Sequence, residues 1–433
     1  MSQRGSRVQA SRPERAALVS LTTGSSQRVD PELHLEELSG LASAAGAIVV
    51  LRAMQDRQAP DPATLIGSGK AEQIAKACEE ADADVVIVDN DLSPAQGRNL
   101  EKILHRRVID RTQLILDIFA RRARTREGKL QVELAQLQYA LPRLVGSSDA
   151  LSRQGGGIGT LGPGETKLET DRRLIRYRIS KLKGEIAEVQ ARRGHLRARR
   201  ARREVPTVAL VGYTNAGKTT LFNALTGDDA VASDALFVTL DPLVRKVKLP
   251  DKRQILLSDT VGFIDRLPHQ LVAAFQATLE EVAGANLLLH VADAAAPDRE
   301  RRDAAVLSVL DEVGAGRVPT LVVFNKCDLL SFEELTRLKS MYPAAVFVSA
   351  LRGMGQTGLL DILASRLAMD TAVVQLTFDP ESPEHRKAIA DLYRQARVLS
   401  HVAVEDKVMI EADVPRRLLD RLARVVTVVE LPA

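Results

Sequence analysis

The sequence predicts an α/β protein in four parts. In order, these are a small α/β domain, a long antiparallel helical hairpin, an α/β domain with a mixed doubly wound sheet, and a small α+β domain. Three observations lead to this prediction. Strand-like and helix-like stretches alternate in residues 15–110 and again in 205–370, apolar residues recur every seven positions in 111–204, and residues 371–433 follow a strand–helix–strand–strand–helix–strand pattern.

The first domain is expected to contain a parallel sheet, because helices separate its strands. The expected strands are 17–22, 47–52, 85–89 and 107–109, and the expected helices are 31–45, 69–81 and 94–105. Residues 1–14 precede this domain and predict a disordered basic tail.

Residues 111–204 are expected to form a helical arm. Two series of apolar residues with a period of seven run through it: Leu116, Ala123, Leu130 and Leu137, then Leu168, Ile175, Leu182, Val189 and Leu196. The first series predicts one helix that Pro142 ends, and the second predicts a helix over 167–203, about 55 Å long at 1.5 Å per residue. Each series can be buried only against the other, which predicts an antiparallel hairpin and leaves no apolar seam for a second chain. A monomer is therefore expected.

The tip of the arm is the loop 143–166, in which six glycines fall within residues 155–164. A loop of this length is usually functional, and glycine lets the backbone approach another surface closely. The alternative is a flexible connector.

Residues 169–203 carry thirteen Lys or Arg against four Asp or Glu, although the net charge of the whole chain is only +4. This predicts an anionic partner for the arm, unless the charges form only a solvated helix face.

The composition excludes several classes of protein. No stretch approaches the roughly eighteen consecutive apolar residues of a membrane-spanning helix, and the polar start is unlike a signal peptide. Two cysteines, Cys78 and Cys327, cannot build a disulfide framework. We expect a cytoplasmic protein, with or without a membrane-associated fraction.

Residues 212–219 form the motif on which the functional prediction depends. They read Gly-Tyr-Thr-Asn-Ala-Gly-Lys-Thr, follow an apolar stretch at 207–211 and precede a helical pattern. This strand–loop–helix setting is that of a P-loop, whose backbone N–H groups surround phosphates at a helix N-terminus. Lys218 is expected to reach the β- and γ-phosphates, and the Thr219 hydroxyl to bind Mg²⁺.

Two further motifs concern the phosphates and Mg²⁺. An expected strand at 254–258 ends at residues 259–262, Asp-Thr-Val-Gly. The Asp259 carboxylate can hold Mg²⁺ through water, and the Gly262 N–H can meet the γ-phosphate. Thr239 lies between this motif and the P-loop, where a switch threonine would close on Mg²⁺.

Two more motifs concern the base. A strand at 319–324 ends at residues 325–328, Asn-Lys-Cys-Asp, and the two oxygens of Asp328 match the two N–H donors of guanine. A strand at 345–348 is followed by residues 349–351, Ser-Ala-Leu, which offer a backbone N–H to guanine O6. The series predicts a P-loop GTPase domain.

The predicted site residues follow from these motifs. Lys218, Thr239 and Gly262 are the catalytic candidates, and Thr219 and Thr239 are the metal ligands. The residues expected around GTP are Gly212, Tyr213, Thr214, Asn215, Ala216, Gly217, Lys218, Thr219, Thr220, Phe237, Val238, Thr239, Leu240, Asp241, Asp259, Thr260, Val261, Gly262, Asn325, Lys326, Cys327, Asp328, Ser349, Ala350 and Leu351.

Residues 155–173, Gly-Gly-Gly-Ile-Gly-Thr-Leu-Gly-Pro-Gly-Glu-Thr-Lys-Leu-Glu-Thr-Asp-Arg-Arg, closely resemble the signature segment of the HflX GTPases. Segments 65–70, 237–242 and 267–275 resemble the same family, so the resemblance covers nearly the whole chain from about residue 15. It implies a translation-associated GTPase that binds the large ribosomal subunit and its rRNA and, in the family, can split stalled ribosomes under stress. A basic arm could neutralise phosphates between RNA helices.

Two residues depart from the pattern of Ras-like enzymes. Phe263 stands where a glutamine orients the attacking water, so we expect slow hydrolysis in the isolated protein and a ribosomal stimulus. The alternative is a core aromatic, with catalysis arranged elsewhere in the chain. In several related GTPases an asparagine at the position of Asn215 helps to hold K⁺, whereas a simple Asx turn is the alternative.

Other functions remain open at this stage. A GTP-switched module for other RNAs or regulatory proteins would share the same motifs. Residues 67–70, Gly-Ser-Gly-Lys, resemble part of a second P-loop, but a complete one would need glycine at Thr64 and Ser or Thr at Ala71. We weigh an ATP site there against a structural turn at the start of a helix.

Overall fold

The computed structural model describes residues 12–24, 31–144, 167–201, 205–228, 236–237, 239, 243–265, 279, 281–367, 371–404 and 407–431. The chain forms two compact units. The first comprises Met1–His195 with Ser233–Asp241 and Asp265–Ala277, and the second comprises Leu196–Ala232, Pro242–Ile264 and Thr278–Ala433.

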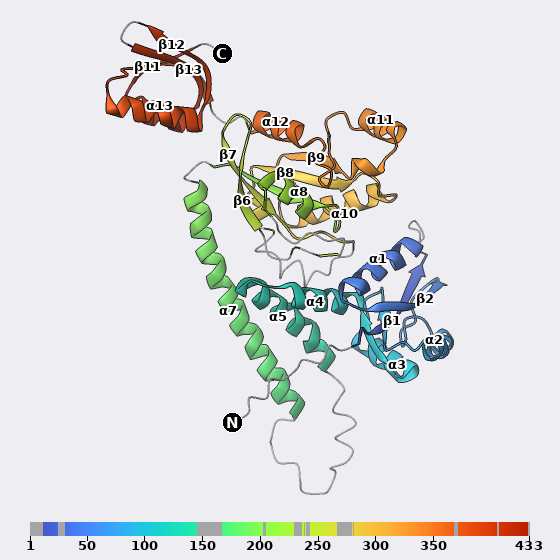
Figure 1. Cartoon of the computed structure of the whole chain (residues 1–433). Coiled ribbons are helices and arrows are strands. Elements are labelled where there is room, and N and C mark those ends of the chain that lie inside the picture. The colour runs from blue at the N-terminus through green and yellow to red at the C-terminus, as the bar shows by residue number, and fades with distance from the viewer. Residues whose placement is uncertain are drawn as a thin grey trace, which may run out of the picture. The chain divides into compact units, whose positions relative to one another are not determined.

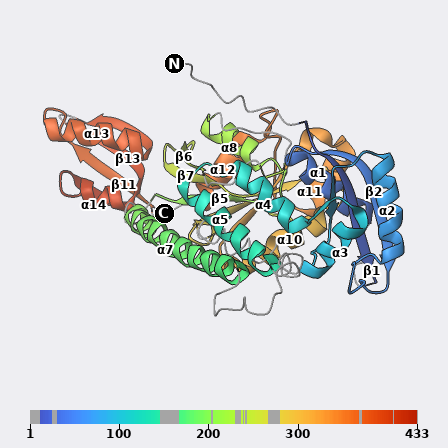
Figure 2. The ribbon, with the colours of Figure 1, turned by 90° about the horizontal axis from the view of Figure 1, so that it is seen from below.

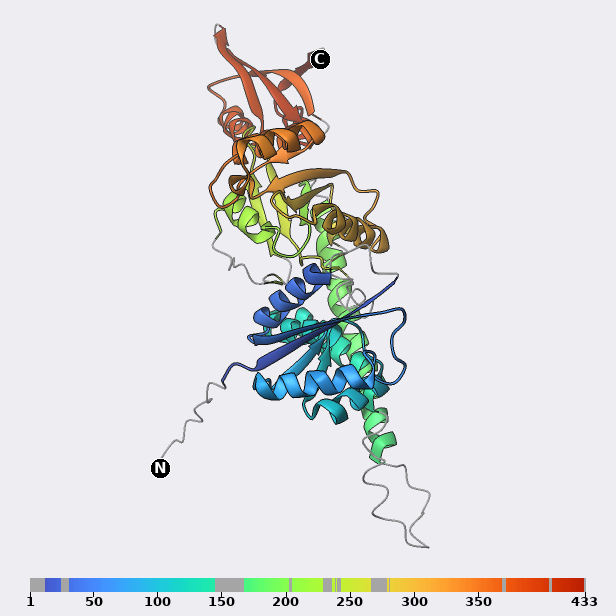
Figure 3. The ribbon, with the colours of Figure 1, turned by 90° about the vertical axis from the view of Figure 1, so that its right-hand side faces the viewer.

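The first unit begins with a four-stranded parallel sheet in the order β2-β1-β3-β4. Its strands are β1 (Arg15–Thr23), β2 (Ile48–Arg57), β3 (Val85–Val88) and β4 (Arg107–Asp110), and its helices are α1 (Pro31–Ala44), α2 (Ser68–Glu80) and α3 (Pro94–Leu104). Helices cover both faces of this sheet (Figure 3). The expected elements are confirmed, although β2 extends to Arg57 because it pairs with β1 along its whole length.

The segment before α2 is a turn rather than a P-loop. Gly67 has a φ of 81°, and a Cβ atom there would lie 2.3 Å from Arg57 Nη1. Arg57 Nη1 in turn donates a hydrogen bond to the Ile66 carbonyl (3.2 Å). The positive φ favours glycine at position 67, and a hydrogen-bonded turn over residues 61–65 leads into α2, in line with the reading as a structural turn.

One expectation for the arm is wrong. The first heptad series does not form one helix but two, α4 (Arg111–Arg122) and α5 (Arg126–Ala140). Ala123 is extended (ψ 113°), and the Thr125 hydroxyl caps α5 by accepting a hydrogen bond from the Gly128 N–H (3.0 Å). A good N-cap competes with helix continuation, which a seven-residue repeat alone does not reveal. The 3₁₀ turn η1 (Leu141–Leu144) contains Pro142 and follows the end of α5.

The second helix of the arm agrees with the prediction, whereas residues 145–166 of the tip loop lie outside the described residues. Helix α7 (Lys167–Ala201) is a single helix beside α5 (Figure 2). Leu130 and Leu134 of α5 pack against Leu182 and Ile186 of α7. Two ion pairs join the helices: Glu133 of α5 with Arg178 of α7 (2.7 Å), and Arg126 of α5 with Glu185 of α7 (3.9 Å). The earlier residue of α5 thus faces the later residue of α7. The hairpin is therefore antiparallel.

The second unit contains a six-stranded sheet in the order β10-β9-β8-β5-β7-β6, in which only β6 is antiparallel to its neighbour. Its strands are β5 (Thr207–Val211), β6 (Leu243–Lys248), β7 (Gln254–Asp259), β8 (Leu287–Asp293), β9 (Thr320–Asn325) and β10 (Val346–Phe347). Its described helices include α8 (Lys218–Thr226), α10 (Arg299–Glu312), η2 (Cys327–Leu329), α11 (Phe332–Met341) and α12 (Gln356–Arg366) (Figure 1). The mixed doubly wound sheet is confirmed.

The C-terminal part of this unit is an antiparallel sheet in the order β12-β13-β11-β14 with two helices. Its elements are β11 (Thr371–Phe378), α13 (Pro383–Gln395), β12 (Arg397–Val404), β13 (Lys407–Pro415), α14 (Arg416–Leu422) and β14 (Thr427–Glu430). This order and connectivity are ferredoxin-like, and the strand–helix–strand–strand–helix–strand pattern expected for residues 371–433 is confirmed. Helix α14 begins only at Arg416, because β13 continues in register with β11 to Pro415.

Among the described residues, no helix combines the length and the apolar character that crossing a membrane would require.

The packing of the arm predicts a large effect at Leu182, which is fully buried. We expect Leu182→Ala to destabilise the hairpin by about 2–5 kcal/mol, the usual cost of removing a buried leucine side chain. Leu174 lies on the same helix but is 59% exposed, so Leu174→Ala is the matched control. Hydrogen exchange of α7 amides measures both variants, and equal exchange rates in the two would contradict the packing described here.

Candidate nucleotide-binding site

The predicted motifs meet at one edge of the six-stranded sheet. Leu210 of β5 pairs with Asp259 at the end of β7, and Asp293 of β8 pairs with Asn325 at the end of β9. In parallel sheets the loops after the carboxyl ends of the strands form the ligand site. The phosphate, metal and base motifs therefore converge because each follows a strand of the same sheet.

The P-loop depends on close backbone approaches. A Cβ atom on Gly212 would lie 2.2 Å from the Val291 carbonyl oxygen, and one on Gly217 would lie 2.2 Å from Asn325 Nδ2. Asn215 is exposed, with a φ of 58°. Within the described residues, the N–H groups of Asn215 and Gly217 donate to no acceptor, so the loop presents donors that suit an anion.

Lys218 is buried at the centre of this loop. Its Nζ donates hydrogen bonds to the carbonyl oxygens of Gly212 (3.1 Å) and Tyr213 (2.8 Å). Burial lowers the pKa of the Lys218 ammonium to about 8, and the nearby charge of Asp259 opposes this shift. A buried cation that only carbonyl dipoles solvate has a strong electrostatic reason to accept a phosphate.

The predicted metal ligands provide hard oxygen atoms. The Thr219 hydroxyl donates to Asp259 Oδ2 (2.8 Å), and Asp259 is fully buried. Thr239 is also buried. Hydroxyl and carboxylate oxygens are the ligands that Mg²⁺ prefers, so the chemistry of this set fits the ion. Thr260 plays a different part, because its hydroxyl donates to the Leu210 carbonyl (2.6 Å) and joins β7 to β5.

The segment after Asp259 lies directly against the P-loop. The Thr214 N–H donates to the Phe263 carbonyl (2.6 Å), and the Phe263 N–H donates to the Gly212 carbonyl (3.1 Å). A Cβ atom on Gly262 would lie 2.8 Å from Thr214 Cα and 3.1 Å from Lys218 Nζ. The Phe263 ring is buried, which confirms the reading as a core aromatic.

The base motifs are connected to the P-loop through Asn325. Its Nδ2 donates to the Ala216 carbonyl (2.9 Å), and its Oδ1 accepts from the Ala350 N–H (2.9 Å). The Ser349 N–H donates to Met354 (3.0 Å), whereas the Leu351 N–H has no acceptor among the described residues. Of the three backbone donors that the sequence proposes for guanine O6, Leu351 is thus the one left for a base.

The carboxylate of Asp328 lies 3.9 Å from Arg352 Nε. The sulfur atom of Cys327 donates to the Phe324 carbonyl (3.2 Å).

Several predicted residues lie elsewhere. Phe237 belongs to the first unit, where its ring packs edge-on against Phe119 of α4 at 4.7 Å between centroids. Its ring is therefore in an apolar contact rather than at a nucleotide. Val238, Leu240 and Asp241 lie outside the described residues.

Two residues of this region were not predicted. The Asp293 carboxylate forms an ion pair with Lys326 Nζ (2.8 Å). The guanidinium of Arg302 lies 5.2 Å from the centre of the Tyr213 ring. Asp293 ends an apolar run, 287–292, at the same edge as Asp259 and Asn325, so this signal was readable in the sequence. Arg302 has no sequence signal, because its position on α10 depends on tertiary packing.

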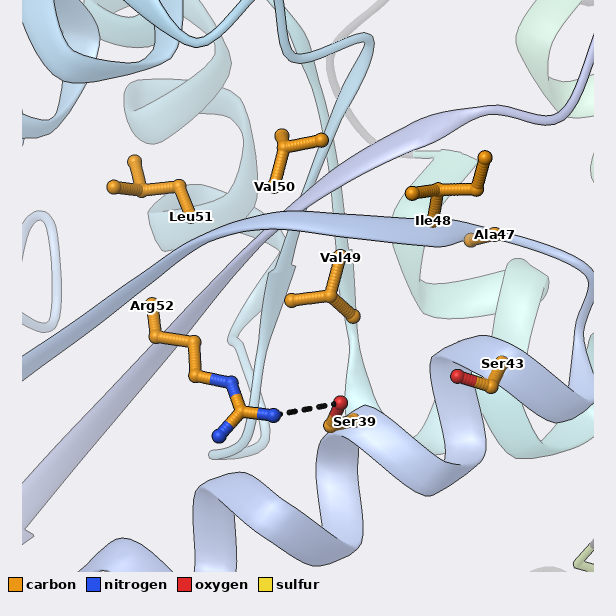
Figure 4. Close-up of a pocket in the computed structure, with 8 residues that line it drawn as sticks. All are labelled: Ser39, Ser43, Ala47, Ile48, Val49, Val50, Leu51 and Arg52. Atoms are coloured by element: carbon orange, nitrogen blue, oxygen red, sulfur yellow. Dashed lines mark hydrogen bonds between the residues drawn. The ribbon is translucent and has the colours of Figure 1, made fainter.

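A hollow on the first unit does not compete with this site. It lies between α1 and the edge strand β2 and is lined by Ser39, Ser43 and residues 47–52 (Figure 4). Its charged group, Arg52, already donates to the Ser39 hydroxyl (3.1 Å). The hollow brings together no nucleophile, acid or metal ligand.

The convergent edge can therefore hold a nucleoside triphosphate with Mg²⁺. In such a complex the loop 212–219 would surround the phosphates, Lys218 would supply positive charge, and the oxygens of Thr219 and Asp259, which are hydrogen-bonded to each other, would suit Mg²⁺. Asn325 and Asp328 stand on the base side.

Three family models match the chain. They are described as GTP-binding GTPase N-terminal (residues 32–120), GTP-binding GTPase Middle Region (residues 122–200) and 50S ribosome-binding GTPase (residues 207–326).

Curated relatives match over most of the chain. The GTPase HflX of Caldanaerobacter subterraneus subsp. tengcongensis is 45% identical over 94% of this chain and 93% of its own length. The GTPase HflX of Escherichia coli is 49% identical over 83% of this chain and 84% of its own length. A crystal structure of a GTP-binding protein from the archaeon Sulfolobus solfataricus in complex with GDP is 26% identical, covers 82% of this chain and 98% of that chain, and gives a TM-score of 0.42.

The environment of Lys218 predicts a pH-dependent nucleotide affinity. The amine of the free protein loses its proton as pH rises through its pKa of about 8, whereas bound phosphates favour the protonated form. The contribution of Lys218 to affinity is therefore complete below pH 8 and declines above it, by up to about tenfold per pH unit. Calorimetric titration with GDP between pH 7 and 9.5 measures this, and Lys218→Met should bind more weakly without the same slope. A flat affinity in the unsubstituted protein would contradict the assignment.

Proposed function

Because the chain belongs to the HflX family of GTP hydrolases, we propose that it binds the large ribosomal subunit and uses GTP hydrolysis to dissociate or rescue stalled ribosomes under stress. The proposed setting is the cytoplasm, where ribosomes are found, and the proposed state is a monomer.

The basic helical arm is the observation that carries this proposal. Helix α7 is a single long helix with an excess of Lys and Arg, and among its described side chains Leu182 and Ile186 pack against α5. Its exposed side includes Arg173, Tyr177 and Lys181. Clustered cations on an extended helix bind RNA phosphates and release counterions, which suits a partner as large and as anionic as rRNA.

We assign the parts of the chain to separate tasks. Residues 15–110 form an N-terminal α/β domain, 111–204 the arm that contacts the ribosome, 205–370 the GTPase domain and 371–433 a C-terminal domain. Residues 1–14 are a basic tail.

In the GTPase domain, the residues around GTP are those of the P-loop and of the three motifs after strands. Lys218 and the Gly262 N–H contact the phosphates, Thr219 and Thr239 hold Mg²⁺, and Asp328 recognises guanine. When bound, Mg²⁺ supplies charge neutralisation on the phosphate oxygens.

Hydrolysis in the isolated protein is expected to be slow. The buried ring of Phe263 cannot orient a water molecule, and no other group in this role is evident among the described residues. The ribosome would order the segments around Thr239 and Gly262, as partners of other GTPases do. This would confine GTP turnover to the moment of ribosome binding.

A GTP-switched module for another RNA is the second candidate, because a basic helix does not select one RNA by charge alone. The two candidates differ in which RNA accelerates hydrolysis.

The proposal predicts that purified large ribosomal subunits accelerate steady-state GTP turnover by about tenfold or more, a gain that correctly positioning the water and the phosphates can supply. Small subunits and an unrelated structured RNA at equal phosphate concentration are the controls. Acceleration by any RNA would favour the second candidate, and a flat rate with every addition would reject the ribosomal role.

We also propose that K⁺ binds beside Asn215. Within the described residues, the Asn215 side chain makes no hydrogen bond, so the alternative Asx turn has no support. A carboxamide oxygen and phosphate oxygens could share a monovalent cation and neutralise charge as hydrolysis proceeds. We expect faster turnover in K⁺ than in Na⁺ at matched ionic strength, and loss of this difference in Asn215→Ala. Equal rates of GTP turnover in K⁺ and in Na⁺ would contradict the proposed K⁺ site.

A further inference from the structure

We infer that Asp110 and Arg111, neighbours at the end of β4, couple the base of the helical arm to the segment that follows Gly262. The inference rests on the proposed function only in its final consequence for ribosomes. The contacts that carry it lie within the first unit, whereas Gly262 belongs to the second.

Asp110 connects β4 to the arm. Its carboxylate is buried, and it accepts hydrogen bonds from Tyr139 Oη (2.8 Å), from Arg143 Nη2 (2.9 Å) and from the N–H groups of Leu92 (3.3 Å) and Gln113 (2.9 Å). Tyr139 lies near the end of α5 and Arg143 in η1. A buried carboxylate with this many donors holds its partners firmly, because each lost bond would leave charge uncompensated.

Arg143, in η1 after the arm helix α5, strengthens the contact between Asp110 and Tyr139. Its guanidinium lies 3.5 Å from the centre of the Tyr139 ring and donates to the Leu92 carbonyl (2.8 Å). The end of α5 is thus fixed to β4 and to the loop after β3. Displacement of the arm at this point would change the environment of Asp110 directly.

Arg111 continues the chain of contacts on the other side. Its guanidinium donates to Asp89 Oδ1 (2.9 Å), to the Glu37 carboxylate and to the backbone carbonyl of Asp265 (3.2 Å). The two carboxylates account for its charge. The third bond reaches 154 positions along the chain, to a residue that stands three after Gly262.

A second contact involves the segment of the switch threonine. Phe119, two turns after Arg111 on α4, packs against Phe237, which stands two residues before Thr239 and has a φ of 58°. Helix α4 therefore contacts both stretches that GTP is expected to reorganise, through a hydrogen bond at one and a ring at the other.

The physical consequence is reciprocal. When a γ-phosphate draws in Gly262 and Thr239, residues 237 and 265 must move or strain with them, because they are only two and three residues away. A displacement of Arg111 would also displace its sequence neighbour Asp110. The hydrogen bonds from Tyr139 and Arg143 to the Asp110 carboxylate would then change as well. By linkage, whatever stabilises one arrangement of the arm must favour one nucleotide state by the same free energy.

The first test does not involve ribosomes. Hydrogen exchange of the full chain is compared with GDP and with a non-hydrolysable GTP analogue, both with Mg²⁺, at the amides of Leu92, Gln113 and residues 139–144. We expect the nucleotide to change exchange there by about fivefold, within the usual range of coupling free energies. Arg111→Lys keeps the charge beside Asp89 and Glu37 but cannot reach three acceptors, so the nucleotide dependence should disappear.

Arg106→Lys is the matched control. Arg106 also donates to backbone carbonyls, those of Ala83 (2.7 Å) and Leu104 (3.2 Å), but touches neither Asp110 nor Asp265. The Arg106→Lys variant should preserve the nucleotide dependence of hydrogen exchange at these amides. If Arg111→Lys fails to fold, Tyr139→Phe removes one bond to Asp110 without altering Arg111, and it should weaken the response at Leu92 at least twofold. No nucleotide response at these amides in the unsubstituted chain, or a full response in the folded Arg111→Lys or Tyr139→Phe chain, would overturn the inference.

The consequence for ribosomes is a separate measurement. Arg111→Lys should co-sediment with large subunits as the unsubstituted chain does and keep its KM for GTP, but its stimulated kcat should fall by about tenfold. A merely structural defect would lower binding and basal turnover together. If large subunits do not stimulate the unsubstituted chain, the proposed function fails while the exchange result still decides the coupling.

Discussion

The nucleotide site depends on one buried side chain, that of Asn325. Its amide nitrogen holds the Ala216 carbonyl and its amide oxygen holds the Ala350 N–H, so one planar group fixes the P-loop relative to the loop after β10. The approach is so close that only glycine fits at position 217. Because phosphate and base must be bound at a fixed separation, this spacing has to exist before GTP arrives, and preorganisation of this kind reduces the entropic cost of binding.

The first unit is organised by buried charge. Asp89, Asp110 and Arg111 all lie at the carboxyl edge of its parallel sheet, and each is nearly inaccessible to water. Such a network gives modest net stability but is costly to leave half-satisfied, so it specifies one arrangement of the surrounding segments. That property suits a junction between a long arm and a nucleotide switch.

The two units use helices differently. In the arm, Leu182 and Ile186 of α7 pack against α5, and charged residues of α7 such as Arg173 and Lys181 are exposed. In the GTPase domain, helices flank a six-stranded sheet, and the predicted motifs follow the carboxyl ends of its strands. The chemistry is thus confined to the sheet edge, while the arm offers the extended surface that a large anionic partner requires. Contacts from α4 to Phe237 and Asp265 lie within the first unit, and both residues stand close in sequence to groups expected at the nucleotide.

Much of the site was readable from the sequence, because a P-loop and the motifs that follow strands are local patterns. Residues 212–219, Asp259, Asn325 and Asp328 each follow a recognisable strand, and parallel pairing then brings them to one edge. The ferredoxin-like end and the long helix α7 were also predictable, since each element has its own periodicity.

What the sequence determined, then, was which groups carry the chemistry and which segments are helices and strands. The tertiary structure alone decided which of these groups are in contact. The break between α4 and α5 at Ala123 is invisible to a heptad count, because it depends on a cap at Thr125 and on the burial of α4 in the first unit. Likewise, the bond from Arg111 to Asp265 joins residues 154 positions apart, and no local pattern encodes a contact that exists only once both segments are folded.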